Sequence, residues 1–252
     1  MSDEERSEMP FLDHLEELRW RLLKAGLSVA VCSIAAWFFT DYVIDLIASL
    51  VGEVYFLAPT EAFLVRLKLA VIMGVMAAVP IISYQLWQFI SPGLYKSEKK
   101  IVVPVVLATT IFFIIGAAFC YFVVLPAAIK FLMGYGTENM TPLISIGNLL
   151  SFSAYMVLAF GIVFELPVVS FFLGKIGLVS YKTLAKGRRY AVILGLVLGA
   201  TLTPPDVFSQ VMLAGPLVIL YEISIWLVKF TANKRRPDDE LNDDEREVGL
   251  SG

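Results

Sequence analysis

Residues 101–125 of the chain read IVVPVVLATTIFFIIGAAFCYFVVL and contain no charged side chain. As an α-helix, a segment of this length rises about 1.5 Å per residue and exceeds the roughly 30 Å thickness of a bilayer's hydrocarbon core. An uncharged run of more than about 18 apolar residues is typical of a membrane-spanning helix. This stretch therefore predicts that the chain lies in a membrane.

Five further apolar runs lie before and after this one in the sequence. Together the six runs predict an all-α polytopic protein with six transmembrane helices. Three are long enough to span, and two are short, with about 14 residues and so about 21 Å of apolar helix each. Prolines inside the predicted spans indicate a bent bundle. The long runs are 22–39, 64–89 and 149–173, the short ones are 190–203 and 208–221, and the prolines are Pro80, Pro104, Pro167 and Pro216.

The composition agrees with a membrane protein. Of the 252 residues, 58% are hydrophobic and 17% are charged, whereas a soluble domain has about a quarter of its residues charged. An ordinary soluble enzyme is therefore excluded. The net charge of −3 provides no basic stripe for nucleic acid. Cys32 and Cys120 lie in apolar runs and are interpreted as small apolar fillers.

The distribution of Lys and Arg predicts the orientation. Seventeen of the 20 fall on one side of the six-span arrangement, so the positive-inside rule places both termini in the cytoplasm. The acidic first 19 residues do not resemble a signal peptide, and the first span is expected to be retained. We expect residues 1–230 to form one membrane domain with a cytoplasmic amphipathic tail (1–21), and residues 231–252 to be a disordered tail. The aromatic and proline-rich connections 40–63 and 126–148 are expected to form an ordered cap on the outer side.

Catalytic motifs are missing from the sequence. The chain has a single histidine, His14, and contains no HExxH, no Cys/His cluster, no GxxxxGK[ST] loop and no serine or cysteine with a base at a plausible spacing. We therefore expect no enzyme activity, no metal and no cofactor.

Four polar features remain. In the tail 11–21, Glu17 and Arg21 are spaced to pair along a helix. Glu98, the one acid among three lysines of 94–100, either neutralises them or pairs with a visiting cation. Glu165 lies deep in a predicted span, where a carboxylate is a functional-site hypothesis by default, the alternative being a neutral group bonded to a neighbouring helix. In the segment 203–210, Asp206 caps the sixth helix from a rigid turn with Pro204 and Pro205, but capping does not explain Gln210.

Taken together, these segments resemble the TatC family, the core subunit of the twin-arginine protein translocase. The resemblance covers about residues 9–230 and rests on five motifs in order on a six-span frame. They are FLDHLEELRWR (11–21), YQLWQFISPGLYKSE (84–98), YFVVLP (121–126), AFGIVFELP (159–167) and LTPPDVFSQ (202–210).

The resemblance implies a receptor for twin-arginine signal peptides of folded cargo, located in the cytoplasmic membrane of a prokaryote. It implies assembly with the single-span subunits TatA and TatB, in a complex that also holds further copies of this chain. It also implies transport driven by the proton motive force. Glu17 and Glu98 match the contacts to the arginine pair, Arg19 matches a residue that supports this surface, and Phe89 lies in the signal-binding loop region. Glu165 matches a polar residue on a concave membrane-facing wall, and Gln210 a position linked to the small subunits.

Two other classes of function were weighed against this one. A secondary transporter or ion channel could use Glu165 as a proton or cation site, but it would need internal repeats or several membrane acids. An intramembrane protease would need a paired nucleophile or two aspartates within the spans. The sequence has none of these features.

The predicted topology is tested by cysteine accessibility at residue 138, in the connection before the fourth span. In a background without other cysteines, Glu138→Cys in intact cells is expected to react with a membrane-impermeant maleimide added outside, because this connection carries little positive charge. Labelling of this cysteine only after the cytoplasmic side is opened would contradict the N-in, C-in topology.

Overall fold

The structure, a computed structural model, describes residues 11–90, 102–136, 143–202 and 207–232, and most of these residues are helical. An isolated bridge between Tyr55 and Ser145 is the only β-type pairing within those ranges. The structure divides into two compact units, residues 1–161 and 162–252, which are described separately. The helices are α1 (Phe11–Trp37), α2 (Thr40–Ala48), α3 (Pro59–Ile90), α4 (Val102–Phe119), α5 (Leu125–Met133), α6 (Ile146–Val163), α7 (Leu166–Lys175), α8 (Tyr181–Lys186), α9 (Arg188–Leu202) and α10 (Val207–Ala232).

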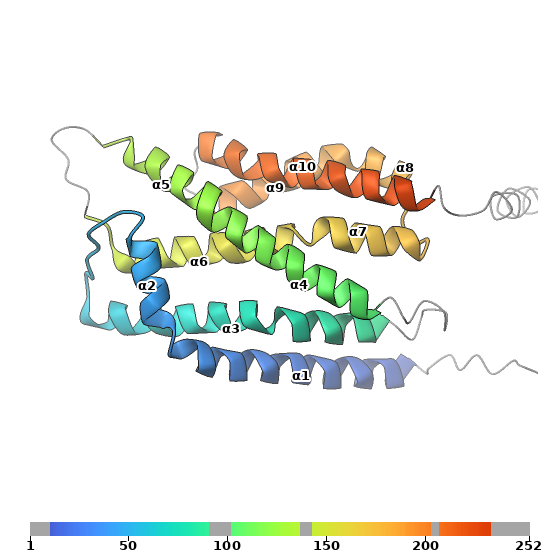
Figure 1. Cartoon of the computed structure of the whole chain (residues 1–252), viewed down its shortest axis with the longest axis horizontal. Helices are drawn as coiled ribbons and strands as arrows, with labels where there is room; N and C mark the ends of the chain where they lie inside the picture. The colour runs from blue at the N-terminus through green and yellow to red at the C-terminus, as the bar shows by residue number, and fades with distance from the viewer. Residues whose placement is uncertain (1–10, 91–101, 137–142, 203–206, 233–252) are drawn as a thin grey trace, which may run out of the picture. The chain divides into compact units, whose positions relative to one another are not determined.

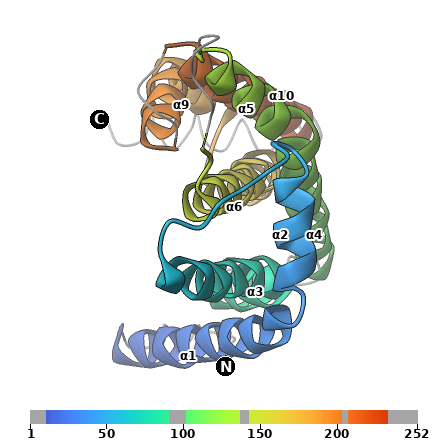
Figure 2. The same cartoon turned by 90° about the vertical axis from the view of Figure 1, so that its left-hand side faces the viewer.

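In the first unit, α1 and α3 lie antiparallel and side by side (Figures 1 and 2). Glycine makes this approach possible. A Cβ atom added at Gly74 would lie 2.6 Å from both Cα and N of Ser33 on α1, far inside van der Waals contact. The predicted tail helix and first span are one continuous helix of 27 residues, since no proline or glycine pair interrupts the sequence between them.

A π-helical turn at Cys120–Val124 separates α4 from α5. Pro126 in the first turn of α5 has no N–H to donate to the carbonyl of Phe122, four residues earlier, and a local widening of the helix accommodates that loss. The same effect ends α6. Pro167 in the first turn of α7 cannot donate to Val163, which is the last residue of α6.

The two long connections are ordered and joined to each other over their described residues. Glu61, in the first turn of α3, accepts hydrogen bonds from the Ser145 hydroxyl (2.5 Å) and from the backbone N–H groups of Gly147 (2.9 Å) and Leu57 (2.6 Å). Its carboxylate therefore lies at the N-terminal ends of both α3 and α6, where negative charge is favoured. This agrees with the predicted ordered cap, although residues 137–142 lie outside the described part.

In the second unit, α10 packs against α7 and α9, and glycines again lie at the contacts. A Cβ atom at Gly174 on α7 would lie 2.8 Å from Val228, and one at Gly199 on α9 would lie 3.1 Å from Gln210. Arg188, at the start of α9, donates two hydrogen bonds to Glu222, from Nε at 2.6 Å and Nη2 at 3.0 Å. This ion pair fixes the start of α9 to the middle of α10.

The prediction of a short sixth helix is wrong. The helix α10 has 26 residues and continues through Glu222, because the pair with Arg188 accommodates the carboxylate that follows the apolar run 208–221. The fifth helix is short as predicted, with 15 residues in α9.

Five helical stretches are long and apolar enough to cross a membrane, by length and composition: 14–37, 59–90, 102–133, 146–175 and 213–230. The prediction of six spans would need α9 as the remaining one.

Gly74→Ala tests the contact between α1 and α3. The added methyl group would overlap the Ser33 backbone, and overpacking of this kind lowers the free energy of unfolding by about 1–3 kcal/mol. Gly26→Ala is the matched control, because a Cβ at Gly26 on α1 meets nothing within 4 Å. Unfolding of both purified variants in detergent should show a loss for Gly74→Ala alone. Equal stabilities would contradict the role assigned to Gly74.

Candidate functional site at the start of α1

Between His14 and Leu22, α1 protects the Glu17–Arg21 pair on the side of α3 and leaves its leucines exposed. Leu15, Leu18 and Leu22 are 45%, 40% and 70% exposed, whereas the Glu17 and Arg21 side chains are 21% and 18% exposed. A helix of a water-soluble protein shows the opposite pattern. For a helix that enters a membrane, exposed leucines suit a lipid environment, and the protected polar face can bind a polar partner.

Glu17 and Arg21 form the predicted ion pair along α1. Arg21 donates from Nε to Glu17 Oε1 at 2.8 Å and also from Nη2 to the same oxygen. Arg21 Nη2 is in addition 3.3 Å from Gln88 Oε1 on α3, and Gln88 Nε2 donates to the Tyr84 hydroxyl at 3.0 Å. The pair is therefore connected to a second helix.

The remaining carboxylate oxygen, Glu17 Oε2, is buried and has no hydrogen-bond partner within the described residues. A buried charged oxygen without a donor is energetically costly. A guanidinium group supplies the donors that such an oxygen lacks, in the geometry that a carboxylate prefers.

His14 provides a second contact between these two helix ends. Its ring stacks on Phe89, with 4.3 Å between ring centroids and 17° between the planes. His14, Glu17 and Arg21 are three and four residues apart and so share one side of α1. The structure thus brings the predicted site residues Glu17 and Phe89 to neighbouring helix ends.

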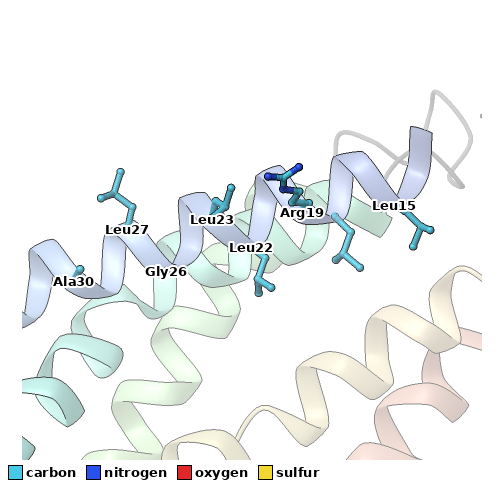
Figure 3. A pocket seen from close by; sticks show the side chains of 8 residues that line it. Leu15, Arg19, Leu22, Leu23, Gly26, Leu27 and Ala30 are labelled. Atoms are coloured by element: carbon cyan, nitrogen blue, oxygen red, sulfur yellow. The ribbon is translucent and has the colours of Figure 1, made fainter. Parts of the chain in front are cut away.

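Arg19 lies elsewhere on the helix. It is two residues from Glu17, which corresponds to about 200° around the helix axis. Figure 3 shows it on the exposed side of α1. There it lines an open apolar hollow of about 760 Å³ with Leu22, Leu23 and neighbouring residues. The structure does not bring Arg19 together with Glu17.

The other predicted site residues divide into two groups. Glu98 and the turn Pro204, Pro205 and Asp206 lie outside the described residues. Glu165 lies in the short turn between α6 and α7, where Val169 N–H donates to its backbone carbonyl at 2.9 Å. Both of its carboxylate oxygens are buried. The predicted fourth span is therefore two helices, with the acid at their junction, because Pro167 interrupts the helix there.

Gln210 has a role within the chain. Its side-chain Nε2 donates to the backbone carbonyl of Leu196 at 2.7 Å, and its Cγ packs over Gly199. Gly195 and Gly199, four residues apart on α9, both contact α10 of the same chain.

No group of three or more His, Cys, Asp or Glu side chains that could hold a metal ion occurs among the described residues. Cys32 and Cys120 are both free thiols, and Cys120 is buried.

Comparison with known proteins decides the family. Residues 13–216 match the model of the Sec-independent protein translocase protein (TatC). The chain belongs to the TatC family. It is 40% identical over 245 residues to the TatC protein of Desulforapulum autotrophicum, covering 94% of this chain and 90% of that one. It is 39% identical over 236 residues to the TatC protein of Aquifex aeolicus, covering 90% of this chain and 98% of that one.

The fold of this chain also matches a solved TatC structure. A crystal structure of the twin-arginine translocase receptor TatC matches with a TM-score of 0.80 and 40% identity, covering 87% of this chain and 99% of that chain. This TatC-family chain is thus a multi-pass membrane protein of a protein translocase and not an enzyme, as the sequence indicated.

The sequence showed the Glu17–Arg21 spacing but not what α3 adds to it. Gln88 and His14 lie in quoted motifs, yet their partners are 67 and 75 residues away along the chain. Only the antiparallel packing of α1 and α3 brings them together. The sequence carries no local signal for these contacts, because it does not show which side of α1 packs on α3.

Proposed function

We propose that this chain is the signal-peptide receptor and core component of a twin-arginine translocase, which exports folded proteins across the cytoplasmic membrane of a prokaryote using the proton motive force. The observation that carries the proposal is the match, over most of the chain, to a structure described as the twin-arginine translocase receptor. The protected carboxylate of Glu17 adds a chemical reason, because its free oxygen suits a guanidinium.

In this proposal, Glu17 and Glu98 bind the two arginines of the signal peptide. A carboxylate and a guanidinium form charge-assisted hydrogen bonds that are about twice as strong as neutral ones, and lysine cannot reproduce the forked geometry. Phe89 supports the site through its stack on His14. Arg19 contributes from the opposite side of α1, where it can contact a segment of the peptide beyond the arginine pair.

The proposed topology has six spans, with both termini in the cytoplasm and residues 1–230 as one membrane domain. It requires that the 15-residue helix α9 crosses a locally thinned bilayer or is shielded by neighbouring helices. The positive-inside rule supports this arrangement, since an odd number of crossings would separate the basic segments.

TatA and TatB are the proposed partners, in a complex that also holds further copies of this chain. Glu165 is the proposed docking residue in the membrane. Glu165 lies about 15 Å along the helix from Lys175, the basic residue that ends α7, and so it lies within the predicted span. A partner helix with a polar side chain in its own span could form hydrogen bonds with it there. Gln210 supports docking indirectly, because its amide bond to Leu196 holds α9 against α10.

The arginine-pair contact is tested with Glu17→Ala and Glu98→Ala. Loss of a hydrogen bond to a charged group costs about 1.5–3 kcal/mol at a protected site, so Glu17→Ala should weaken binding of a twin-arginine peptide roughly ten- to a hundredfold. Glu98→Ala should weaken it in the same direction. Fluorescence titration of full-length protein in nanodiscs with a labelled synthetic signal peptide measures the effect.

The matched control is Glu16→Ala, which removes the same charge from the exposed neighbouring position and should leave binding nearly unchanged. A peptide with lysine in place of both arginines should bind the wild type and Glu17→Ala with similar affinity. If Glu17→Ala and Glu98→Ala bound both peptides as tightly as the wild type does, that result would contradict the assignment.

The docking role is tested with Glu165→Gln and Glu165→Leu. The amide can still form hydrogen bonds, so Glu165→Gln should keep much of the assembly with TatA and TatB and much of the transport. Glu165→Leu should lose both, while insertion and peptide binding persist. Ile162→Leu, an apolar exchange at an exposed position one turn earlier, is the control. Loss of transport in Glu165→Gln with assembly intact would instead favour proton chemistry at this residue.

A further inference from the structure

We propose that Arg21 is a positioning residue for signal-peptide recognition: it fixes one oxygen of the Glu17 carboxylate and leaves the other as the acceptor for the guanidinium of the peptide. The inference rests on the proposed function of Glu17. It adds Arg21 and Gln88, neither of which contacts the peptide in this scheme, to the residues on which recognition depends.

The contacts of Arg21 with Glu17 are one-sided. Both Nε and Nη2 donate to Oε1, whereas a forked pair of arginine and carboxylate uses both oxygens. The second oxygen, Oε2, is buried without a partner among the described residues. The carboxylate is therefore neutralised at one oxygen, and its second oxygen keeps an unused capacity to accept a hydrogen bond.

A second helix holds Arg21 in this position. Nη2 also lies 3.3 Å from Gln88 Oε1, and Gln88 Nε2 is fixed by its 3.0 Å hydrogen bond to the Tyr84 hydroxyl. A pair within one exposed helix gives only a few tenths of a kcal/mol and leaves both side chains mobile. The tether to α3 removes that freedom, so that the Glu17 side chain is ordered before the peptide arrives, which lowers the entropic cost of binding.

Arg21 could instead act as a competitor, since its guanidinium is chemically the same as that of the peptide. A competitor would be expected to occupy both oxygens of the Glu17 carboxylate, which would leave no acceptor for the peptide. The observed arrangement, with Nη2 shared between Glu17 and Gln88, favours positioning. The two roles predict opposite effects of removing Arg21.

The test measures binding of synthetic twin-arginine and twin-lysine signal peptides to full-length protein in nanodiscs. Arg21→Ala should weaken binding of the twin-arginine peptide about two- to tenfold, the range expected from one side chain that is no longer ordered in advance. It should also lower the ratio of the affinity for the twin-arginine peptide to that for the twin-lysine peptide. Arg21→Lys, which keeps the charge but not the fork, should fall between wild type and Arg21→Ala. Lys24→Ala removes the same charge one turn further along α1 at an exposed position and should not weaken binding.

A combination of variants separates this role from a direct or purely structural one. If Arg21 acts through Glu17, Arg21→Ala should cause no further loss in a Glu17→Ala background. A similar loss in both backgrounds, or tighter binding by Arg21→Ala, would overturn the inference.

Gln88→Ala keeps the pair on α1 and removes only the tether, so a loss of about twofold is expected for the twin-arginine peptide. This variant decides the question if Arg21→Ala does not fold, and unchanged binding would then overturn the inference. Unchanged binding by Glu17→Ala would contradict the proposed function itself, whereas a loss for Glu17→Ala with none for Arg21→Ala and Gln88→Ala would contradict only the role of Arg21.

Discussion

The architecture depends on one constraint, namely that backbone N–H and C=O groups inside a bilayer must be satisfied by the protein itself. Helices do this within a single segment, which explains why the described residues are helical almost throughout. The constraint also governs the interruptions. The π-helical turn before Pro126 and the break before Pro167 occur where a proline removes a donor, and neighbouring backbone groups re-form hydrogen bonds at once.

Close helix packing follows from the same environment. Lipid tails are as apolar as leucine, so helices associate through tight contacts and hydrogen bonds rather than through burial from water. Gly74 against Ser33, Gly174 against Val228 and Gly199 against Gln210 are such contacts. Gly74 and Gly199 lie against backbone atoms of the facing helix, whereas Gly174 lies against the side chain of Val228.

Two paired charged side chains connect helices among the described residues. Glu61 connects the starts of α3 and α6, and Arg188 connects α9 to Glu222 on α10. Outside the spans, the Glu53 carboxylate accepts the Tyr55 hydroxyl at 2.6 Å and raises the pKa of that phenol. Glu17 differs from these residues, since its second oxygen is buried and has no hydrogen-bond partner among the described residues. That unpaired oxygen is the reason for the cation-binding role proposed for Glu17.

The sequence by itself determined the membrane location, the helical class, the family and the acidic residues of the proposed site, because runs of apolar residues, charge bias and short motifs are local properties of the chain. The pair of Glu17 and Arg21 was predictable for the same reason, since four residues span one helical turn. The length of α10 was not, because Glu222 ends an apolar run in the sequence but is neutralised by Arg188, 34 residues away. The tertiary structure alone decided that the polar side of α1 faces α3, that Gln88 holds Arg21, and that Gln210 bonds within the chain. These contacts join residues far apart in sequence, and their existence depends on how two helices pack.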